Sequence, residues 1–193
     1  QLAAFAFTVV LVSTQGYAQS GIVHIVIETT AGAIDADLDS ARAPITVTNF
    51  LRYVDAHAYN GGRFHRTVKS DNQPGNAVKI EVIQASVAAG DARVRFPAIE
   101  LERTNVTRLS HTDFALSMAR AGPNTATSDF FITIGSQPEL DFGGKRNADG
   151  QGFAVFGHVV KGSEVARKIQ QSPATEQNLT PPVAITRIAR KSK

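Results

Sequence analysis

Short runs typical of β-strands, several of which alternate between hydrophobic and polar residues, recur along most of the chain. A two-residue period is typical of β-strands that bury one face. Between these stretches lie clusters of Gly, Pro, Asn and Asp, which favour turns. The pattern predicts eight strands, at residues 23–27, 33–38, 64–68, 78–84, 115–118, 130–134, 154–160 and 183–188.

Two segments show the helical period instead. In residues 44–54, Pro44 is suited to a first helical turn, and apolar side chains follow at the spacing i, i+3, i+4, i+7: Val47, Phe50, Leu51 and Val54. Residues 164–170 form the second predicted helix, with Val165 and Ile169 on one side. Strands and helices do not alternate as in βαβ units, so the pattern favours a mainly β fold, an antiparallel barrel or a sandwich.

The first 18 residues differ from the rest of the chain. Residues 2–12 are apolar except for Thr8, a run too short to span a bilayer, and the small residues Gly16 and Ala18 follow. This predicts a secretory signal peptide over residues 1–18, truncated at its start because the first residue is Gln. The alternative is a first core strand. Cleavage after Ala18 would leave a single domain, residues 19–193, in the periplasm or secreted, with no stable membrane insertion.

Composition narrows the class of protein. With 193 residues, 42% of them hydrophobic, and a net charge of +3, the chain suits one globular domain. Basic residues are scattered apart from a cluster after residue 186, which argues against nucleic acid as a partner. The absence of cysteine excludes disulfides, thiolate zinc sites and cysteine nucleophiles, and it is consistent with an oxidising compartment.

Familiar catalytic motifs are missing. The five histidines show no HExxH or other close-paired spacing, so no metal site is expected. There is no GxSxG and no Gly-rich phosphate loop of the Walker type. We therefore expect no metal or organic cofactor, and neither a hydrolase nor a nucleotide-dependent enzyme is indicated.

Three ordered stretches carry a resemblance to a known family. They read NFLRYVDAHAYNGGRFHRTV (49–68), SMARAGPNTATSDFFITIG (117–135) and FAVFGHVVKGSEVARKI (153–169). The chain resembles the cyclophilin-type peptidyl-prolyl cis-trans isomerases over residues 23–188. The resemblance implies an eight-stranded antiparallel closed β-barrel capped by two α-helices. It also implies that proline-containing unfolded or partly folded polypeptides are the partners. The apolar stripes are accounted for by helices packing on the barrel, so a monomer is expected.

The resemblance also implies roles for individual residues. Arg66 matches the family's catalytic arginine, and Phe131 matches the base of the proline pocket. The other matched positions are substrate-binding: Val82, Gln84, Ala119, Arg120, Ala121, Leu140 and Phe153. Arg120 is expected to act through its main chain. The structural alternatives are a surface arginine at 66 and ordinary core packing for the apolar residues.

The chain also departs from the family pattern. Glu81 stands where the family has phenylalanine, which would thin one pocket wall. Ala85 and Ser86 replace twin glycines, and Phe114 replaces a small residue. Glu139 replaces a tryptophan that contacts cyclosporin in some members, so we predict weak cyclosporin binding.

Strand alternation yields two further expectations about the site. It places Val82 and Gln84 on one face and Glu81 on the other. It also places Phe64 and Arg66 on one face unless a bulge intervenes.

Two functions fit these features, an isomerase and a binding module, and the isomerase is favoured. The first is an isomerase that accelerates X–Pro rotation during folding of exported proteins, and the retained Arg66 and Phe131 favour it. The alternative is a proline-peptide-binding module or chaperone with weak or no isomerase activity, which the altered positions would favour. The sequence does not indicate the client proteins or the residue preferred before proline.

Overall fold

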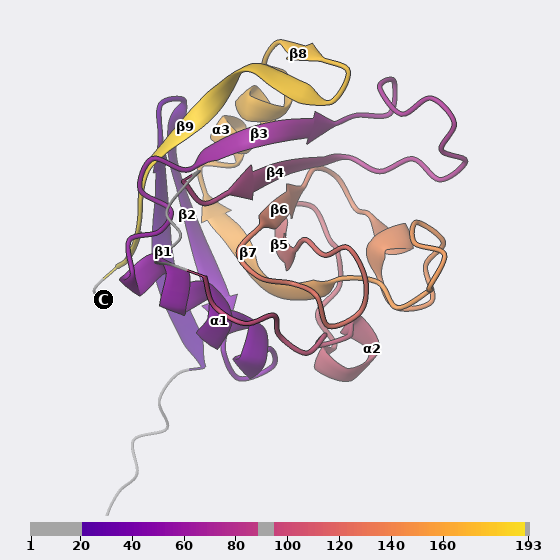
Figure 1. The fold of residues 1–193 in the computed structure, drawn as a ribbon, viewed down its shortest axis with the longest axis horizontal. Coiled ribbons are helices and arrows are strands. Elements are labelled where there is room, and N and C mark those ends of the chain that lie inside the picture. Colours follow the sequence, from indigo (N-terminus) through magenta and orange to yellow (C-terminus); the bar gives the residue numbers. More distant parts are fainter. Residues whose placement is uncertain (1–20, 89–94, 192–193) are drawn as a thin grey trace, which may run out of the picture.

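The computed structural model describes residues 21–88 and 95–191 (Figure 1). The strands are β1 (Ile22–Thr29), β2 (Gly32–Asp39), β3 (Arg63–Val68), β4 (Val82–Ser86), β5 (Ala115–Met118), β6 (Phe130–Thr133), β7 (Ala154–Lys161), β8 (Ala174–Thr175) and β9 (Asn178–Arg190). The helices are α1 (Pro44–Asp55), α2 (Thr104–Thr107) and α3 (Ser163–Gln170), with a 3-10 turn, η1 (Pro138–Leu140). The predicted signal peptide, residues 1–18, lies outside the described residues.

Eight of these strands form a closed antiparallel ring. Neighbours pair in the order β1-β2-β7-β5-β6-β4-β3-β9, and β9 pairs back with β1. The two-residue β8 pairs with β9 outside the ring. A closed ring has no unpaired strand edge. The fold is therefore a barrel and not a sandwich, and its eight strands correspond to the eight that hydrophobic alternation predicts.

Helices close the barrel, and aromatic side chains fill it. Helix α1 packs on β2, β7 and β9, whereas α3 packs on β2, β3 and β4. Inside, Phe50 of α1 is fully buried and lies 5.2 Å from Tyr59, 5.4 Å from Phe130 and 5.1 Å from Phe156 between ring centroids. Burying one such ring stabilises the fold by about 2–3 kcal/mol. The interior is thus a packed core, and a ligand site has to lie on the outside of the wall.

The amino-terminal end of α1 is capped by a residue distant in sequence. Ala43 precedes the helix and provides no side-chain cap. Instead, the carboxylate of Glu102 accepts hydrogen bonds from the backbone N–H groups of Ile45, at 3.0 Å, and Thr46, at 2.7 Å. A carboxylate at this end satisfies free donors and interacts favourably with the helix dipole. Glu102 therefore ties the segment between β4 and β5 to the first helix.

The elements differ from the prediction in several places: β8 was not predicted, and β9 runs from Asn178 to Arg190 where residues 183–188 were expected. Strand β4 begins at Val82 and not at Val78, because side chains take up the backbone groups before it: Arg146 bonds to the Val78 carbonyl, and Gln73 to the N–H and carbonyl of Ile80. Helix α2 was not predicted, since its four residues are Asn, Val and two Thr, all weak helix formers. No helix of the described residues has the length and apolar character to cross a membrane.

Candidate active site

A β-bulge in β3 sends neighbouring side chains to opposite sides of the barrel wall. The register of β3 against both β4 and β9 shifts between Phe64 and Arg66. Phe64 is fully buried in the core, whereas the half-buried Arg66 lines a pocket on the outer face. Alternation alone would place both on one face, but the exception allowed for is present, since a bulge at His65 adds one residue to β3. Arg66 owes its position at the pocket to this bulge.

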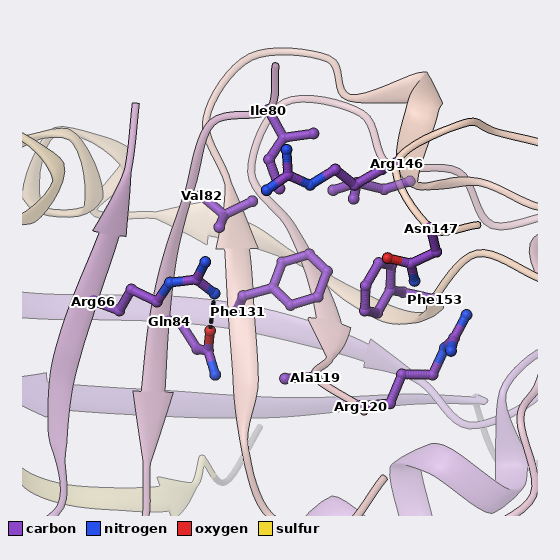
Figure 2. Close-up of a pocket in the computed structure, with 11 residues that line it drawn as sticks. Arg66, Ile80, Val82, Gln84, Ala119, Arg120, Phe131, Arg146, Asn147 and Phe153 are labelled. Carbon is purple, nitrogen blue, oxygen red and sulfur yellow. Dashed lines mark hydrogen bonds between the residues drawn. The ribbon is translucent and has the colours of Figure 1, made fainter. Parts of the chain in front are cut away.

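The pocket is formed on the outer face of β3, β4 and β6 and has a volume of about 270 Å³ (Figure 2). Arg66 pairs with Gln84 across β3 and β4, and Gln84 pairs with Phe131 across β4 and β6. These three side chains therefore form one row across the wall. Eight of the nine predicted site residues line the pocket: Arg66, Val82, Gln84, Ala119, Arg120, Phe131, Leu140 and Phe153. The ninth, Ala121, does not line it.

The floor of the pocket is apolar. Phe131 is 4% exposed and packs in a small cluster outside the main core, together with Val68, Ile80, Val82 and Leu140. The ring of Phe153 stands edge-on to Phe131, with centroids 5.4 Å apart and planes at 89°. Figure 2 shows the Phe131 ring in the middle of the pocket, with the Arg66 guanidinium directed toward it. An uncharged ring of a ligand could therefore pack on this surface, with the Arg66 guanidinium at the edge of the pocket.

Two glutamines fix the guanidinium of Arg66. Its Nη1 donates to Gln84 Oε1 at 3.0 Å, and its Nε and Nη2 donate to Gln177 Oε1 at 2.9 and 2.6 Å. Burial lowers the pKa of Arg66 from its ordinary value, and the charge of Arg146 lowers it further. An arginine stays protonated in proteins and has five N–H groups. Among the described residues three of the five have acceptors, which leaves two that could donate to a substrate.

Gln177 lies in the turn between β8 and β9, far from the motifs that indicate the site. Its Nε2 donates to the carbonyl of Asn72 at 3.0 Å, which leaves its oxygen directed at Arg66. Asn72 in turn donates to the carbonyls of Thr67 and Glu176 at 3.0 and 2.9 Å. The small hairpin outside the ring thus holds the cation in place.

A buried histidine supports the pocket floor from below. His111 is 1% exposed and stacks on Phe131, with centroids 5.9 Å apart and planes at 10°. Its Nδ1 lies 2.6 Å from Asp141 Oδ1 and its Nε2 lies 2.9 Å from Ser117 Oγ. Burial lowers the pKa of His111, while Asp141 opposes this shift. Ser117 is fully buried, so the three residues form a support and not a hydrolytic triad.

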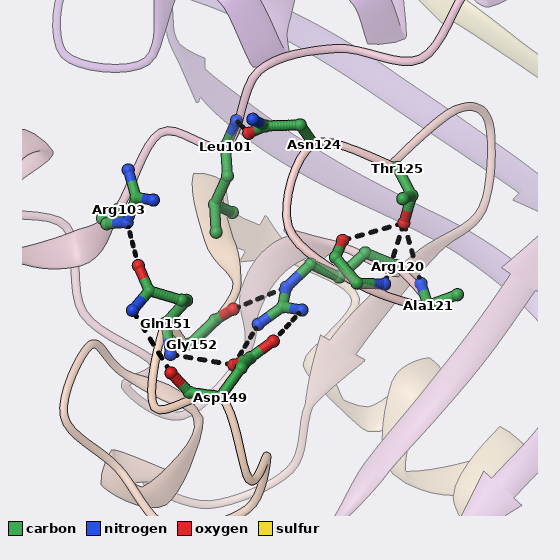
Figure 3. A network of polar contacts seen from close by, with 10 residues as sticks. Leu101, Arg103, Arg120, Ala121, Asn124, Thr125, Asp149, Gln151 and Gly152 are labelled. Carbon is green, nitrogen blue, oxygen red and sulfur yellow. Dashed lines mark hydrogen bonds and ion pairs between the residues drawn. The ribbon is translucent and has the colours of Figure 1, made fainter.

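The side chain of Arg120 joins two loops beside the pocket (Figure 3). Its guanidinium bonds to both carboxylate oxygens of Asp149, at 2.7 and 3.0 Å, and to the Gly152 carbonyl at 2.8 Å, and it lies 5.0 Å from the Phe153 ring centroid. The hydrogen bond from Arg120 lowers the pKa of Asp149 to about 2. The side chain of Arg120 is thus committed to contacts within the protein.

Comparison with known proteins identifies the family. The model of the cyclophilin type peptidyl-prolyl cis-trans isomerase family matches residues 24–190, almost the whole barrel. The chain belongs to this family. The cyclophilin is accordingly an enzyme of the peptidyl-prolyl cis-trans isomerase class.

Relatives similar in sequence are also named as peptidyl-prolyl cis-trans isomerases or isomerase-like proteins. The cyclophilin is 36% identical over 156 residues to the peptidyl-prolyl cis-trans isomerase A of Dickeya dadantii, covering 80% of this chain and 75% of the relative. It is 34% identical over 145 residues to an isomerase of Streptomyces antibioticus, covering 75% and 81%. The isomerase-like 3 protein of Gallus gallus is 31% identical over 158 residues, covering 81% and 88%.

Solved structures share the fold. A cyclophilin of Cryptosporidium parvum superposes with a TM-score of 0.71 and 22% identity, covering 89% of this chain and 99% of that one. A second structure of the same protein was determined in the presence of the dipeptide Ala-Pro, with a TM-score of 0.71 and 23% identity, covering 88% and 99%. At this identity the likeness supports the barrel architecture.

The structure adds pocket residues that the motifs do not indicate: Ile80, Arg146 and Asn147. Glu81 points away from the pocket, where its carboxylate accepts a hydrogen bond from Gln170 Nε2 at 2.8 Å, so the expected alternation around Val82 is confirmed. Ile80 lies on the pocket side and is 8% exposed. It provides apolar surface on the wall that the missing phenylalanine was expected to thin. Alternation over the predicted strand 78–84 places Ile80 on the same face as Val82 and Gln84, although the family motifs assign it no role.

Proposed function

We propose that this cyclophilin accelerates X–Pro rotation during the folding of exported proteins, with Arg66 as the catalytic donor. The observation that carries the proposal is the guanidinium of Arg66, held by Gln84 and Gln177 beside the apolar floor of Phe131. A prolyl ring seated on Phe131 would present its nitrogen to the two free N–H groups of the arginine.

The chemistry needs no nucleophile. Rotation about the amide bond has a barrier of about 20 kcal/mol, because conjugation between nitrogen and carbonyl is lost as the bond twists. The nitrogen lone pair becomes localised in the twisted state and accepts a hydrogen bond far better than in the planar ground state. A fixed cationic donor therefore binds the transition state more tightly than the substrate, which is the requirement for catalysis.

The remaining pocket residues would hold the polypeptide on either side of the rotating bond. Leu140, Val82 and Phe153 surround Phe131 and would fix the prolyl ring. The main chain of residues 119–121 would bind the residue before proline, with Ala121 beyond the pocket itself. The Ala-Pro dipeptide used with the Cryptosporidium cyclophilin supports proline-containing peptides as ligands of this site.

The test is exchange spectroscopy by NMR on a short X–Pro peptide. We expect the unmodified protein to increase the cis-trans exchange rate and Arg66→Ala to reduce kcat/KM by at least about 100-fold, equivalent to about 3 kcal/mol of lost transition-state stabilisation. Arg66→Lys keeps the charge without the planar fork and should fall between the two. Peptide binding without exchange by the unmodified protein would contradict the proposal and support a binding module instead.

The export part of the proposal rests on the apolar run at residues 2–12 and the small residues after it. We expect the chain to be cleaved after Ala18 and to act as a monomer in the periplasm or outside the cell. Because the predicted signal peptide lacks its start, the chain is expressed in a bacterial host behind an added Met and a short basic segment, followed by fractionation and amino-terminal sequencing. A product that starts at Gln19 in the periplasm or medium supports export, and an uncleaved product in the cytoplasm contradicts it.

A further inference from the structure

A second arginine projects over the proline pocket from the loop between η1 and β7. The Nη1 group of Arg146 donates to Gln73 Oε1 at 2.9 Å and to the Val78 carbonyl at 2.7 Å. Gln73 is fully buried, and its Nε2 donates to the carbonyls of Lys69, at 2.7 Å, and Ile80, at 2.8 Å. Arg146 is therefore anchored to a fixed part of the pocket wall.

The positive charge of Arg146 has no anionic partner in the part of the chain that the structure describes. Both of its acceptors are neutral, and so are the two glutamines that hold Arg66. Arg120, the third pocket arginine, is neutralised by Asp149. Among the described residues, no Asp or Glu lines the pocket. The site thus has two uncompensated cations, Arg66 and Arg146, around an apolar floor.

Burial makes this charge more effective. Arg146 is half-buried, so its guanidinium has lost part of its hydration, and this burial lowers its pKa. Arg146 also lowers the pKa of Arg66, so the fields of the two cations overlap across the pocket. A partly desolvated cation with neutral neighbours attracts an anionic ligand more strongly than a hydrated surface arginine does.

The position of Arg146 indicates which substrate residue it would meet. In Figure 2, Ala119 and Arg120 lie on one side of the Phe131 ring, and Ile80 and Arg146 lie on the opposite side. In the proposed function, residues 119–121 bind the residue before proline and Phe131 carries the prolyl ring. A polypeptide that enters past Ala119 therefore leaves toward Arg146.

We propose that Arg146 makes the site selective for polypeptides with an acidic residue directly after the proline. This rests on the proposed function, because the direction of the bound chain follows from the roles of residues 119–121 and Phe131. The carboxylate would meet the guanidinium at its free Nε and Nη2 groups, since Nη1 is occupied by Gln73 and Val78. Arginine is suited to such paired hydrogen bonds with a carboxylate.

The experiment compares peptides that differ by a single residue after proline, Glu, Gln or Lys, with exchange rates measured by NMR. We expect kcat/KM for the Glu peptide to exceed that for the Gln peptide by about 3- to 10-fold at low salt, and the Lys peptide to be the poorest. The ratio of kcat/KM between the Glu and Gln peptides should shrink in 0.5 M NaCl, because salt at this concentration screens charges over roughly 4 Å. A second Glu and Gln pair, placed before proline, should differ little.

Three variants connect the ratio to Arg146. Arg146→Gln should bring the Glu to Gln ratio close to one, and Arg146→Lys should restore most of it. Arg187→Gln is the matched control, since it removes one positive charge from an exposed ion pair with Glu28 on β1 and should leave the ratio unchanged. A ratio near one in the unmodified protein, a ratio that survives Arg146→Gln, or a preference confined to the residue before proline overturns the inference. Absence of exchange with every peptide instead overturns the proposed function.

Discussion

Substitution of Gln177 tests whether this residue holds the Arg66 guanidinium in the position needed for catalysis. Its side-chain oxygen accepts two of the three hydrogen bonds that fix the Arg66 guanidinium, at 2.9 and 2.6 Å. The change Gln177→Ala removes both and leaves the contact with Gln84 at 3.0 Å. Because the residue lies in the turn after β8, outside the ring of eight strands, its loss should leave the barrel itself intact.

The size of the effect follows from these contacts. A hydrogen bond to a charged group contributes about 1.5–3 kcal/mol. The two bonds share one acceptor and are counted as a single paired interaction. If that energy is what keeps the guanidinium in its productive position, kcat/KM should fall by about 10- to 100-fold, since 1.4 kcal/mol corresponds to tenfold. KM should change less than kcat, because Gln177 does not line the pocket.

A double-mutant cycle separates positioning from other effects. Exchange rates are measured for the unmodified protein, Gln177→Ala, Arg66→Ala and the double variant. If Gln177 acts through Arg66, its removal should have no further effect once Arg66 is Ala. Equal losses in both backgrounds, or no loss in the single variant, would refute the assignment of Gln177 as a positioning residue.

Three further predictions concern stability. Removing the remote cap of α1 by Glu102→Ala should lower the free energy of unfolding by about 1 kcal/mol, measured by urea titration, and Glu102→Gln should lower it less. The buried His111 has a lowered pKa in the folded protein, so the unfolded chain binds more protons below about pH 6.5. Stability should therefore decrease as the pH falls from 7.5 to 5, by at most about 1.4 kcal/mol per pH unit from this residue, and the slope should flatten in His111→Gln. Burial raises the pKa of Asp129, which means that its ionised form is penalised in the folded state. Asp129→Asn should raise the melting temperature at pH 7, and this gain should disappear below about pH 4 as the acid becomes protonated; an unchanged melting temperature at pH 7 would contradict this.

The sequence pattern was sufficient to locate the eight strands of the ring, but it left a barrel and a sandwich open, and the family resemblance was needed to choose the barrel. The eight predicted strands of the ring are confirmed: alternation is visible where one face is buried, as in β2, whereas β5 and β6 are buried at every position and appear as short runs between turn residues. The bulge at His65 was not predictable from that alternation, since one inserted residue looks like ordinary sequence. It emerges from the pairing of β3 with both of its neighbours, which is a tertiary property.

Some pocket residues could be predicted from the sequence and others could not. Those on strands or in recurrent motifs, such as Gln84 and Phe131, were found because motif and strand face agree. Arg146 and Gln177 reach the site from loops that the family motifs do not cover, so neither spacing nor periodicity could indicate them. Their positions depend on a few hydrogen bonds: Arg146 donates to Gln73 and to the Val78 carbonyl, and Gln177 donates to the Asn72 carbonyl.

The pairing of β1 with β9 has a consequence for how the protein is made. These strands lie at opposite ends of the described chain, and their contacts join distant residues such as Glu28 and Arg187, which are 159 positions apart in sequence. Contacts between such distant residues form late, because the loop entropy must first be overcome. The barrel can close only after the last strand has been synthesised and released. A chain that emerges end first, from a ribosome or through a translocation channel, would thus remain open until its final strand arrives.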